Sequence, residues 1–567
     1  MGSTYVPQGT TTRLTPADEQ TSVQSSQENL EQGAFHEWPN EAGFDGLTEH
    51  RGPIELKVKG SIPAWAAGSL YRTGPGLCKV EDTKSGTFSI SHWFDGLAHT
   101  HRFDIVAKDA AAEPTVRVYY SSRRQSDKIA ADIKAAGTWR SLTFAQKLDP
   151  CVGIFGKLTS VFNKRSALQN VGVTVSVNLP SLRPPTKAAV DAQGHRAASI
   201  VIATDAAKMC EVDPETMEPL SFPKQSKFHP DLKGPLSGAH GKLDPETGDY
   251  INYNLELAKQ PVYRVFRVSA ATGKTDILAA IPFKAAYIHS FFLTHNYVVL
   301  CVPVAHYELN GLKILWEGNL LDSFKPFDPS ETCRWFVVDR RHGKGVVAEF
   351  ASPARFFFHT VNAFEDDDGD VLCEVVDYPN RYIVDGYYYD VILDRNGKAT
   401  EFWRDGQLAH QSFPRLTRYR LRKKEFATGT STLPAPELVM EIPAPHAGDM
   451  PVINPRYRCR RHRYGYFVVS RALSTFSDAI AKVDTDTREL LQWEGPRGHT
   501  PSEAIFIPRP DAEEEDDGVL LSVVLDGANR TSYLLCLDAR TMTELGSAEC
   551  EFAVAIGLHG RHVPADF

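Results

Sequence analysis

Short apolar segments separated by polar turns recur along most of this chain. Runs rich in β-branched and aromatic residues include residues 115–120, 198–203, 297–304, 334–338, 371–376, 466–469, 519–524 and 532–537. Many end at a turn that begins with Asp, as at residues 213–216, 244–248, 394–397 and 538–541. Because an apolar strand, an Asp-initiated turn and a second strand make a hairpin, the pattern predicts an all-β chain built from hairpins.

A long all-β chain of this kind is best closed as a β-propeller, because radial repetition leaves few sheet edges unpaired. A pair of β-sandwiches is the alternative that the pattern leaves open. Residues 1 to about 35 are rich in Thr, Gln, Ser and Glu and have few large apolar side chains. Such a segment buries too little surface to offset its ordering entropy. We therefore expect a flexible leader over residues 1–35 and a single domain over residues 36–567.

One stretch departs from the strand pattern. Cys151 and Val161, together with Ile154, Phe155, Leu158 and Phe162, follow the i, i+3, i+4, i+7 spacing of an amphipathic helix, and basic residues flank this face. Two interpretations stay open, a helix packed on the body of the protein and a monotopic patch that contacts a membrane.

Charge and composition narrow the class of protein. The 567 residues carry 62 Lys and Arg against 71 Asp and Glu, a formal charge of −9, which excludes a nucleic-acid binder that depends on bulk positive charge. No apolar run approaches the roughly 18 residues that a spanning helix needs. Nine cysteines without a CxxC pair indicate buried thiols in a reducing compartment. We expect a cytosolic protein without an obligate protein partner, and leave peripheral contact with membranes or lipid bodies open.

Histidine is the residue type that stands out chemically. The sequence has no P-loop, GxSxG or HExxH motif, but it has 19 histidines. Four of them lie in apolar or glycine-rich settings at strand boundaries: His240, His289, His359 and His559. Neutral imidazole is a good ligand for a divalent metal, and histidines from different blades can converge on a propeller axis. Spacing alone does not select these four from the nineteen.

Several motifs resemble those of the carotenoid cleavage oxygenases. Residues 71–76 (YRTGPG), 92–96 (HWFDG) and 101–103 (HRF) resemble the N-terminal signature of that family. Residues 239–245, 288–291, 358–365 and 558–560 look like its four iron-ligand motifs, in order. Residues 501–506 and 514–520 are similar to its C-terminal signature, so the resemblance runs from about residue 53 to the end.

This resemblance implies a seven-bladed β-propeller whose axis, under a dome of helices and loops, bears one Fe(II) held by His240, His289, His359 and His559. It also implies carboxylates that hydrogen-bond three of these imidazoles, here Glu503, Asp449 and Asp205. Much of the family has Glu at the two Asp positions, so the reach of the shorter side chain is an open question. Thr174 is a candidate for a small residue that faces the free positions on the iron, with a simple strand threonine as the alternative.

The activity that the resemblance implies is O2-dependent cleavage of a conjugated C=C bond into two carbonyl products. The apolar substrate would enter by a tunnel whose mouth we expect near residues 151–162. Residues 119–125, 144–151 and 170–173 look most like fungal members that cleave torulene or apocarotenals. Three alternatives remain: a stilbene- or phenylpropene-cleaving dioxygenase with Lys128 near the phenol, a retinoid-type isomerase, and a non-enzymatic binding platform.

Overall fold

Three antiparallel sheets follow one another along the middle of the chain. The computed structural model describes residues 5–107, 116–147, 170–182, 199–405, 412–429 and 432–565. The first sheet contains β12 (Leu236–Ser237), β13 (Lys242–Leu243), β14 (Tyr250–Glu256), β15 (Val262–Val268) and β16 (Thr275–Pro282). The second contains β17 (Phe292–Leu293), β18 (Tyr297–Val302), β19 (Thr332–Asp339) and β20 (Val346–Pro353), and the third β21 (Phe356–Glu365), β22 (Val371–Tyr378), β23 (Arg415–Leu421) and β24 (Glu437–Pro443).

Two further sheets flank these three. One contains β8 (Thr174–Val177), β9 (Ile200–Ala203), β10 (Cys210–Val212) and β11 (Pro219–Ser221). The other contains β25 (Asp449–Val452), β26 (Tyr464–Val469), β27 (Ala479–Asp484) and β28 (Leu490–Glu494), with β1 (Thr10–Leu14) added at its edge. A separate hairpin joins β4 (Lys79–Thr83) to β5 (Gly86–Ser89).

The largest sheet interleaves strands from both ends of the chain. Its N-terminal members are β2 (Ile54–Gly60), β3 (Gly68–Leu77), β6 (Leu97–Ala107) and β7 (Val116–Arg124). Its C-terminal members are β29 (His499–Pro501), β30 (Ile505–Pro508), β31 (Gly518–Asp526), β32 (Thr531–Asp538), β33 (Glu544–Glu549) and β34 (His559–Pro564). β2 pairs with both β33 and β7, and β34 pairs with β3. The first and last parts of the chain therefore close onto each other.

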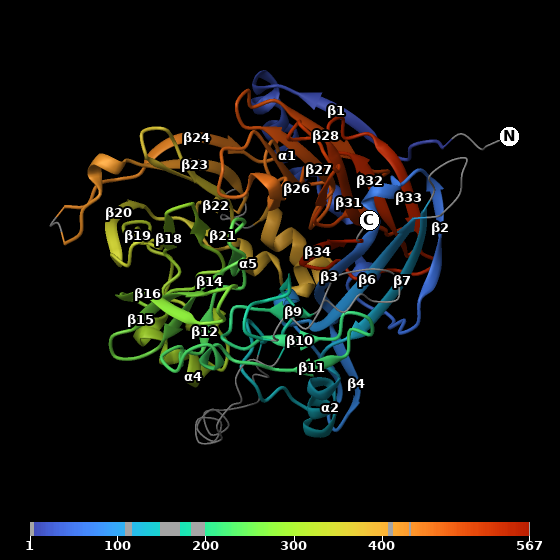
Figure 1. Cartoon of the computed structure of the whole chain (residues 1–567). Helices are drawn as coiled ribbons and strands as arrows, with labels where there is room; N and C mark the ends of the chain where they lie inside the picture. The colour runs from blue at the N-terminus through green and yellow to red at the C-terminus, as the bar shows by residue number, and fades with distance from the viewer. Residues whose placement is uncertain are drawn as a thin grey trace.

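The sheets lie around a common centre. In Figure 1 the green, yellow and orange sheets of β12–β24 occupy one side, and the blue and red strands of the two chain ends occupy the other. Strands dominate and helices are few in the described residues, so the all-β prediction is confirmed. Closure through paired terminal strands leaves few backbone groups exposed at sheet edges.

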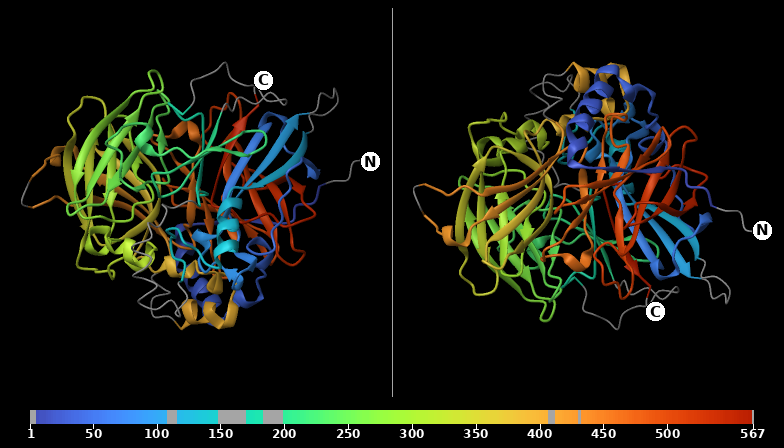
Figure 2. Two further views of the ribbon diagram at one scale, coloured as in Figure 1. Left: turned by 90° about the horizontal axis from the view of Figure 1, so that it is seen from below. Right: turned by 90° about the horizontal axis from the view of Figure 1, so that it is seen from above.

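Helices gather mainly on one face. The described α-helices are α1 (Glu19–Gln32), α2 (Asp127–Ala136), α4 (Lys313–Glu317), α5 (Ile383–Gly386) and α6 (Tyr389–Ile392). Both views of Figure 2 place dark-blue α1 beside the amber segment that contains α5 and α6. No helix in the described ranges is long and apolar enough to cross a membrane.

The N-terminal segment differs from the expected flexible leader. Residues 10–14 form β1, which pairs in register with β28, and residues 19–32 form α1. Leu30 is buried in the main hydrophobic cluster, and Asn29 donates a hydrogen bond to the Arg471 carbonyl. A polar strand can order itself through backbone hydrogen bonds to a sheet edge, and composition does not reveal this. The amphipathic helix expected over residues 151–162 lies outside the described residues.

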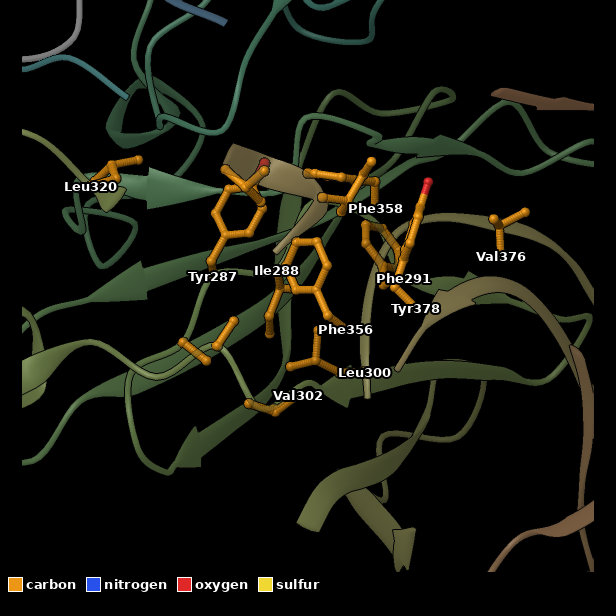
Figure 3. Close-up of a cluster of buried hydrophobic side chains, with 14 of the residues drawn as sticks. Tyr287, Ile288, Phe291, Leu300, Val302, Leu320, Phe356, Phe358, Val376 and Tyr378 are labelled. Carbon is orange, nitrogen blue, oxygen red and sulfur yellow. The ribbon is translucent and has the colours of Figure 1, made fainter. Parts of the chain in front are cut away.

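Aromatic side chains fill the space between the central sheets. Figure 3 shows part of this cluster, including Phe356, Phe358 and Tyr378 from the third sheet beside Tyr287 and Phe291. The rings of Phe356 and Phe358 meet edge to face, with centroids 4.8 Å apart. Such packing fixes the strands that carry the histidines described next.

Candidate metal centre

Four histidines from four different sheets meet at one point. His240 lies between β12 and β13, His289 just before β17, His359 within β21, and His559 at the start of β34. Their ligand nitrogens all lie within 4.8 Å of one another. The Nε2 atoms of His240 and His289 are 3.1 Å apart, and those of His359 and His559 are 3.0 Å apart.

A local irregularity orients one of the four. The pairing of β21 with β22 shifts register between Phe357 and Thr360, so Phe358 and His359 have no regular partner across the ladder. A bulge of this kind changes the direction of a side chain and is common beside functional sites. It points the His359 imidazole toward the other three.

Three of the imidazoles have a carboxylate on the nitrogen that faces away from the cluster. Nδ1 of His289 lies 2.8 Å from Asp205, Nδ1 of His359 lies 2.6 Å from Asp449, and Nδ1 of His559 lies 2.7 Å from Glu503. Both Asp side chains therefore reach their imidazole directly, which answers the question that their length raised. A carboxylate on Nδ1 holds the proton there and leaves Nε2 free to bind a metal. His240 has no such carboxylate among the described residues.

Neighbouring groups hold each carboxylate in place. The Tyr378 hydroxyl donates to Asp449 over 2.6 Å, and the Tyr287 hydroxyl donates to Asp205 over 2.9 Å. Both tyrosines lie in the cluster of Figure 3. Glu503 accepts the N–H of Gly560 over 2.8 Å. Sequence reasoning missed the two tyrosines; the one available signal was the position of Tyr287, two residues before His289 and on the same side of an extended backbone.

Burial disfavours the charged form of two of these imidazoles. Burial, followed by the charges of His559, His289 and His359, lowers the pKa of His240 well below its ordinary value. Burial also lowers the pKa of His359 to about 4, although Asp449 opposes this shift. Both imidazoles are thus neutral at pH 7, the form that binds a metal.

An apolar cavity opens on one side of the histidines. His289, His359 and His559 form part of its wall. Many of the other lining residues are aromatic: Trp93, Phe94, Phe144, Phe358, Tyr378, Tyr387, Trp403, Phe413 and Phe476. Tyr387 and Trp403 come from the helical segment that follows β22, so this segment contributes to the wall of the cavity. The cavity suits a long apolar ligand whose end or middle must reach the cluster.

A second cavity approaches the histidines from another side. We call it the polar channel for the polar and basic residues in its wall: His240, His359, His559, Lys242, Thr360, Arg458 and Arg561. The same wall also contains apolar side chains such as Phe291 and Ile505. Burial, followed by the charge of Arg458, lowers the pKa of Lys242 to about 8. His359 and His559 line both cavities, so the cluster separates an apolar space from a basic one.

Two of the remaining candidate residues, Thr174 and Lys128, are described by the structure, and neither lines the apolar cavity. Thr174 lines the polar channel, and its hydroxyl donates to the Ala239 carbonyl over 2.7 Å, next to His240. Lys128 is exposed on α2 and is not among the described residues that line either cavity. Ile154, Phe155, Leu158 and Phe162, expected to face a membrane, lie outside the described residues.

Comparison with known proteins agrees with this architecture. A carotenoid dioxygenase from Neurospora crassa is 49% identical over 99% of this chain and 97% of its own length. A torulene dioxygenase from Fusarium fujikuroi is 47% identical over 96% and 97%. A variant of the apocarotenoid oxygenase of Synechocystis has the same fold, with a TM-score of 0.69 at 20% identity over 92% of this chain and 98% of that one.

The family model described as retinal pigment epithelial membrane protein matches residues 43–564, nearly the whole chain. This match covers every motif on which the resemblance was based and all four clustered histidines. The chain therefore belongs to the family of the retinal pigment epithelial membrane protein and the carotenoid oxygenases.

Proposed function

We propose that this protein is a dioxygenase that uses O2 to cleave a conjugated C=C bond of a carotenoid or apocarotenoid, such as torulene, into two carbonyl products. The observation that carries this proposal is the apolar cavity, rich in aromatic side chains, whose wall includes three histidines of the four-histidine cluster. A polyene is long, apolar and flat, so aromatic walls can bind it and exclude water. Relatives named carotenoid dioxygenase and torulene dioxygenase support the same substrate class.

The residues of the cluster fit one Fe(II) per chain. The Nε2 atoms lie in pairs 3.1 and 3.0 Å apart, a separation at which two lone pairs repel each other unless a cation lies between them. Nitrogens about 2.1 Å from one ion and at right angles to each other are about 3.0 Å apart. Iron bound by four neutral imidazoles keeps its full positive charge and coordination positions at which O2 can be activated.

The residues of the chain then have separate tasks. Asp205, Asp449 and Glu503 fix the tautomer and direction of three imidazoles. Phe94, Phe358 and the other aromatic rings of the apolar cavity position the polyene and keep water out. Asp205 and Asp449 reach this cavity, but each is engaged by an imidazole and a tyrosine hydroxyl, so neither is free to act as a general base.

We propose further that the fold is a seven-bladed propeller forming one domain. Five of the sheets have four or five strands, and counting the ten-stranded sheet as two blades joined at β2 gives seven. Contact with a membrane or lipid body through Phe155 and its neighbours, in an otherwise cytosolic protein, remains part of the proposal. An apolar substrate favours such contact, because polyenes partition into lipid.

The stilbene alternative has little support. The relatives reported above are named for carotenoid substrates, and Lys128 lies on the protein surface away from both cavities.

A product assay by mass spectrometry tests the proposed function. Iron-loaded protein is given torulene or a β-apocarotenal in micelles and, separately, a hydroxystilbene, under air enriched in 18O2. We expect aldehydes that carry 18O from the polyene alone. Aromatic aldehydes from the stilbene alone would overturn the substrate class, and a product of unchanged mass would indicate an isomerase.

A further inference from the structure

The polar channel contains positive charges that the protein does not neutralise. Lys242, Arg456, Arg458 and Arg561 all line it. Glu503 is the only carboxylate among its described lining residues, and both Glu503 oxygens are engaged, one by His559 and one by the N–H of Gly560. The channel therefore holds an excess of cations with no acidic partner available.

Two of these cations have no polar partner in the described ranges. Neither the Arg458 nor the Arg561 guanidinium makes a hydrogen bond or ion pair with the part of the chain that the structure describes. The charge of each guanidinium disfavours the other, because arginine stays charged at neutral pH. Other inward-facing arginines differ, since Arg340 pairs with Asp244 over 2.7 Å. Arg458 is exposed and Arg561 is half-buried, so both guanidiniums are open to the space of the channel, where an anionic ligand can supply the counter-charge that the described residues do not.

We propose that the polar channel binds a small oxyanion between Arg458 and Arg561. Guanidinium groups favour ligands with two or more terminal oxygens, because their N–H groups form parallel hydrogen bonds with carboxylate or phosphate. The ammonium of Lys242, which donates to the Thr360 hydroxyl over 3.2 Å, lies in the same channel and adds to the attraction. The anion occupies the space on the side of the histidines where His240 lies, away from the aromatic cavity.

Calorimetric titration of the full-length, iron-loaded protein with inorganic phosphate tests this site. Acetate is titrated separately as the carboxylate probe, and all titrations are done at constant ionic strength in a buffer free of other oxyanions. We expect one phosphate or acetate per chain and at least tenfold weaker binding in Arg458→Gln and in Arg561→Gln. Whichever probe binds more tightly identifies the natural ligand as phosphate-like or carboxylate-like. Arg460→Gln, an exposed arginine nearby that does not line the channel, is the matched control and should bind like the unmodified protein.

A second measurement, of melting temperature, distinguishes loss of the anion site from a variant that binds the anion poorly because its fold is damaged. In the absence of oxyanions, Arg458→Gln should melt at or above the temperature of the unmodified protein, because one of two repelling charges is gone. Added phosphate should then raise the melting temperature of the unmodified protein only. Equal binding by Arg458→Gln and the unmodified protein, or binding of neither probe, would overturn the proposal. The result does not depend on turnover of a polyene, so it stands apart from the test of the proposed function.

Discussion

At the scale of single residues, the contact between Asp449 and His359 has the most direct chemical consequence. Asp449→Asn removes the negative charge that holds the proton on Nδ1 of His359, so we expect iron affinity to fall about 10- to 100-fold. Competition with a chromogenic chelator measures this affinity. Asp82→Asn, which changes an exposed carboxylate that forms an ion pair with Lys134, is the control. Unchanged iron affinity in Asp449→Asn would contradict the assigned role.

The sequence motifs located the four histidines and Glu503, because each lies in a short segment that resembles a family signature. The tyrosines that hold Asp205 and Asp449 could not be located in this way. Tyr378 lies 71 positions before Asp449 in the chain, and only the pairing of the sheets brings them together. The basic pair Arg458 and Arg561 was missed for the same reason, since the two residues share a channel but no local pattern.

At the scale of secondary structure, substitutions in the N-terminal helix α1 test whether residues 19–32 are packed on the body of the protein. Leu30 is 3% exposed and packs in the main cluster, so Leu30→Ala should reduce the free energy of unfolding by about 2–5 kcal/mol. Gln27→Ala, on the exposed side of the same helix, should change it by less than about 0.5 kcal/mol. Urea denaturation followed by fluorescence measures both. Equal free energies of unfolding in the two variants would contradict the packing of Leu30 and support the flexible leader that composition predicted.

The strands themselves were largely predictable. The apolar runs at residues 371–376, 466–469 and 532–537 lie within β22, β26 and β32, because alternating or continuous β-branched residues suit buried strands. β1 and α1 escaped prediction because their order depends on distant partners, β28 and the main cluster, and not on their own composition. The bulge at His359 could not be predicted from the sequence either, because the register of a strand depends on its neighbouring strand.

At the scale of the whole molecule, the fold is joined twice across the length of the chain. β34 pairs with β3 and β33 with β2, which ties the C-terminus to the N-terminal strands. The histidines make a second connection, because they join sheets that are up to 319 positions apart, from His240 to His559. The hairpin pattern predicted closure of some kind, but it could not specify which strands would close the ring.

A metal bound at this second connection should stabilise the entire fold. Iron that binds only the folded chain adds RT ln(1 + [Fe]/Kd), about 2.7 kcal/mol at a hundredfold excess over Kd. Chelation should therefore lower the melting temperature of the protein, and re-addition of Fe(II) should restore it. His359→Ala should melt at one temperature with or without iron, whereas His295→Ala, an exposed histidine paired with Glu246, should respond like the unmodified protein. Calorimetric melting with and without chelator measures the shift, and an iron-dependent shift that survives in His359→Ala would show that the metal is held elsewhere.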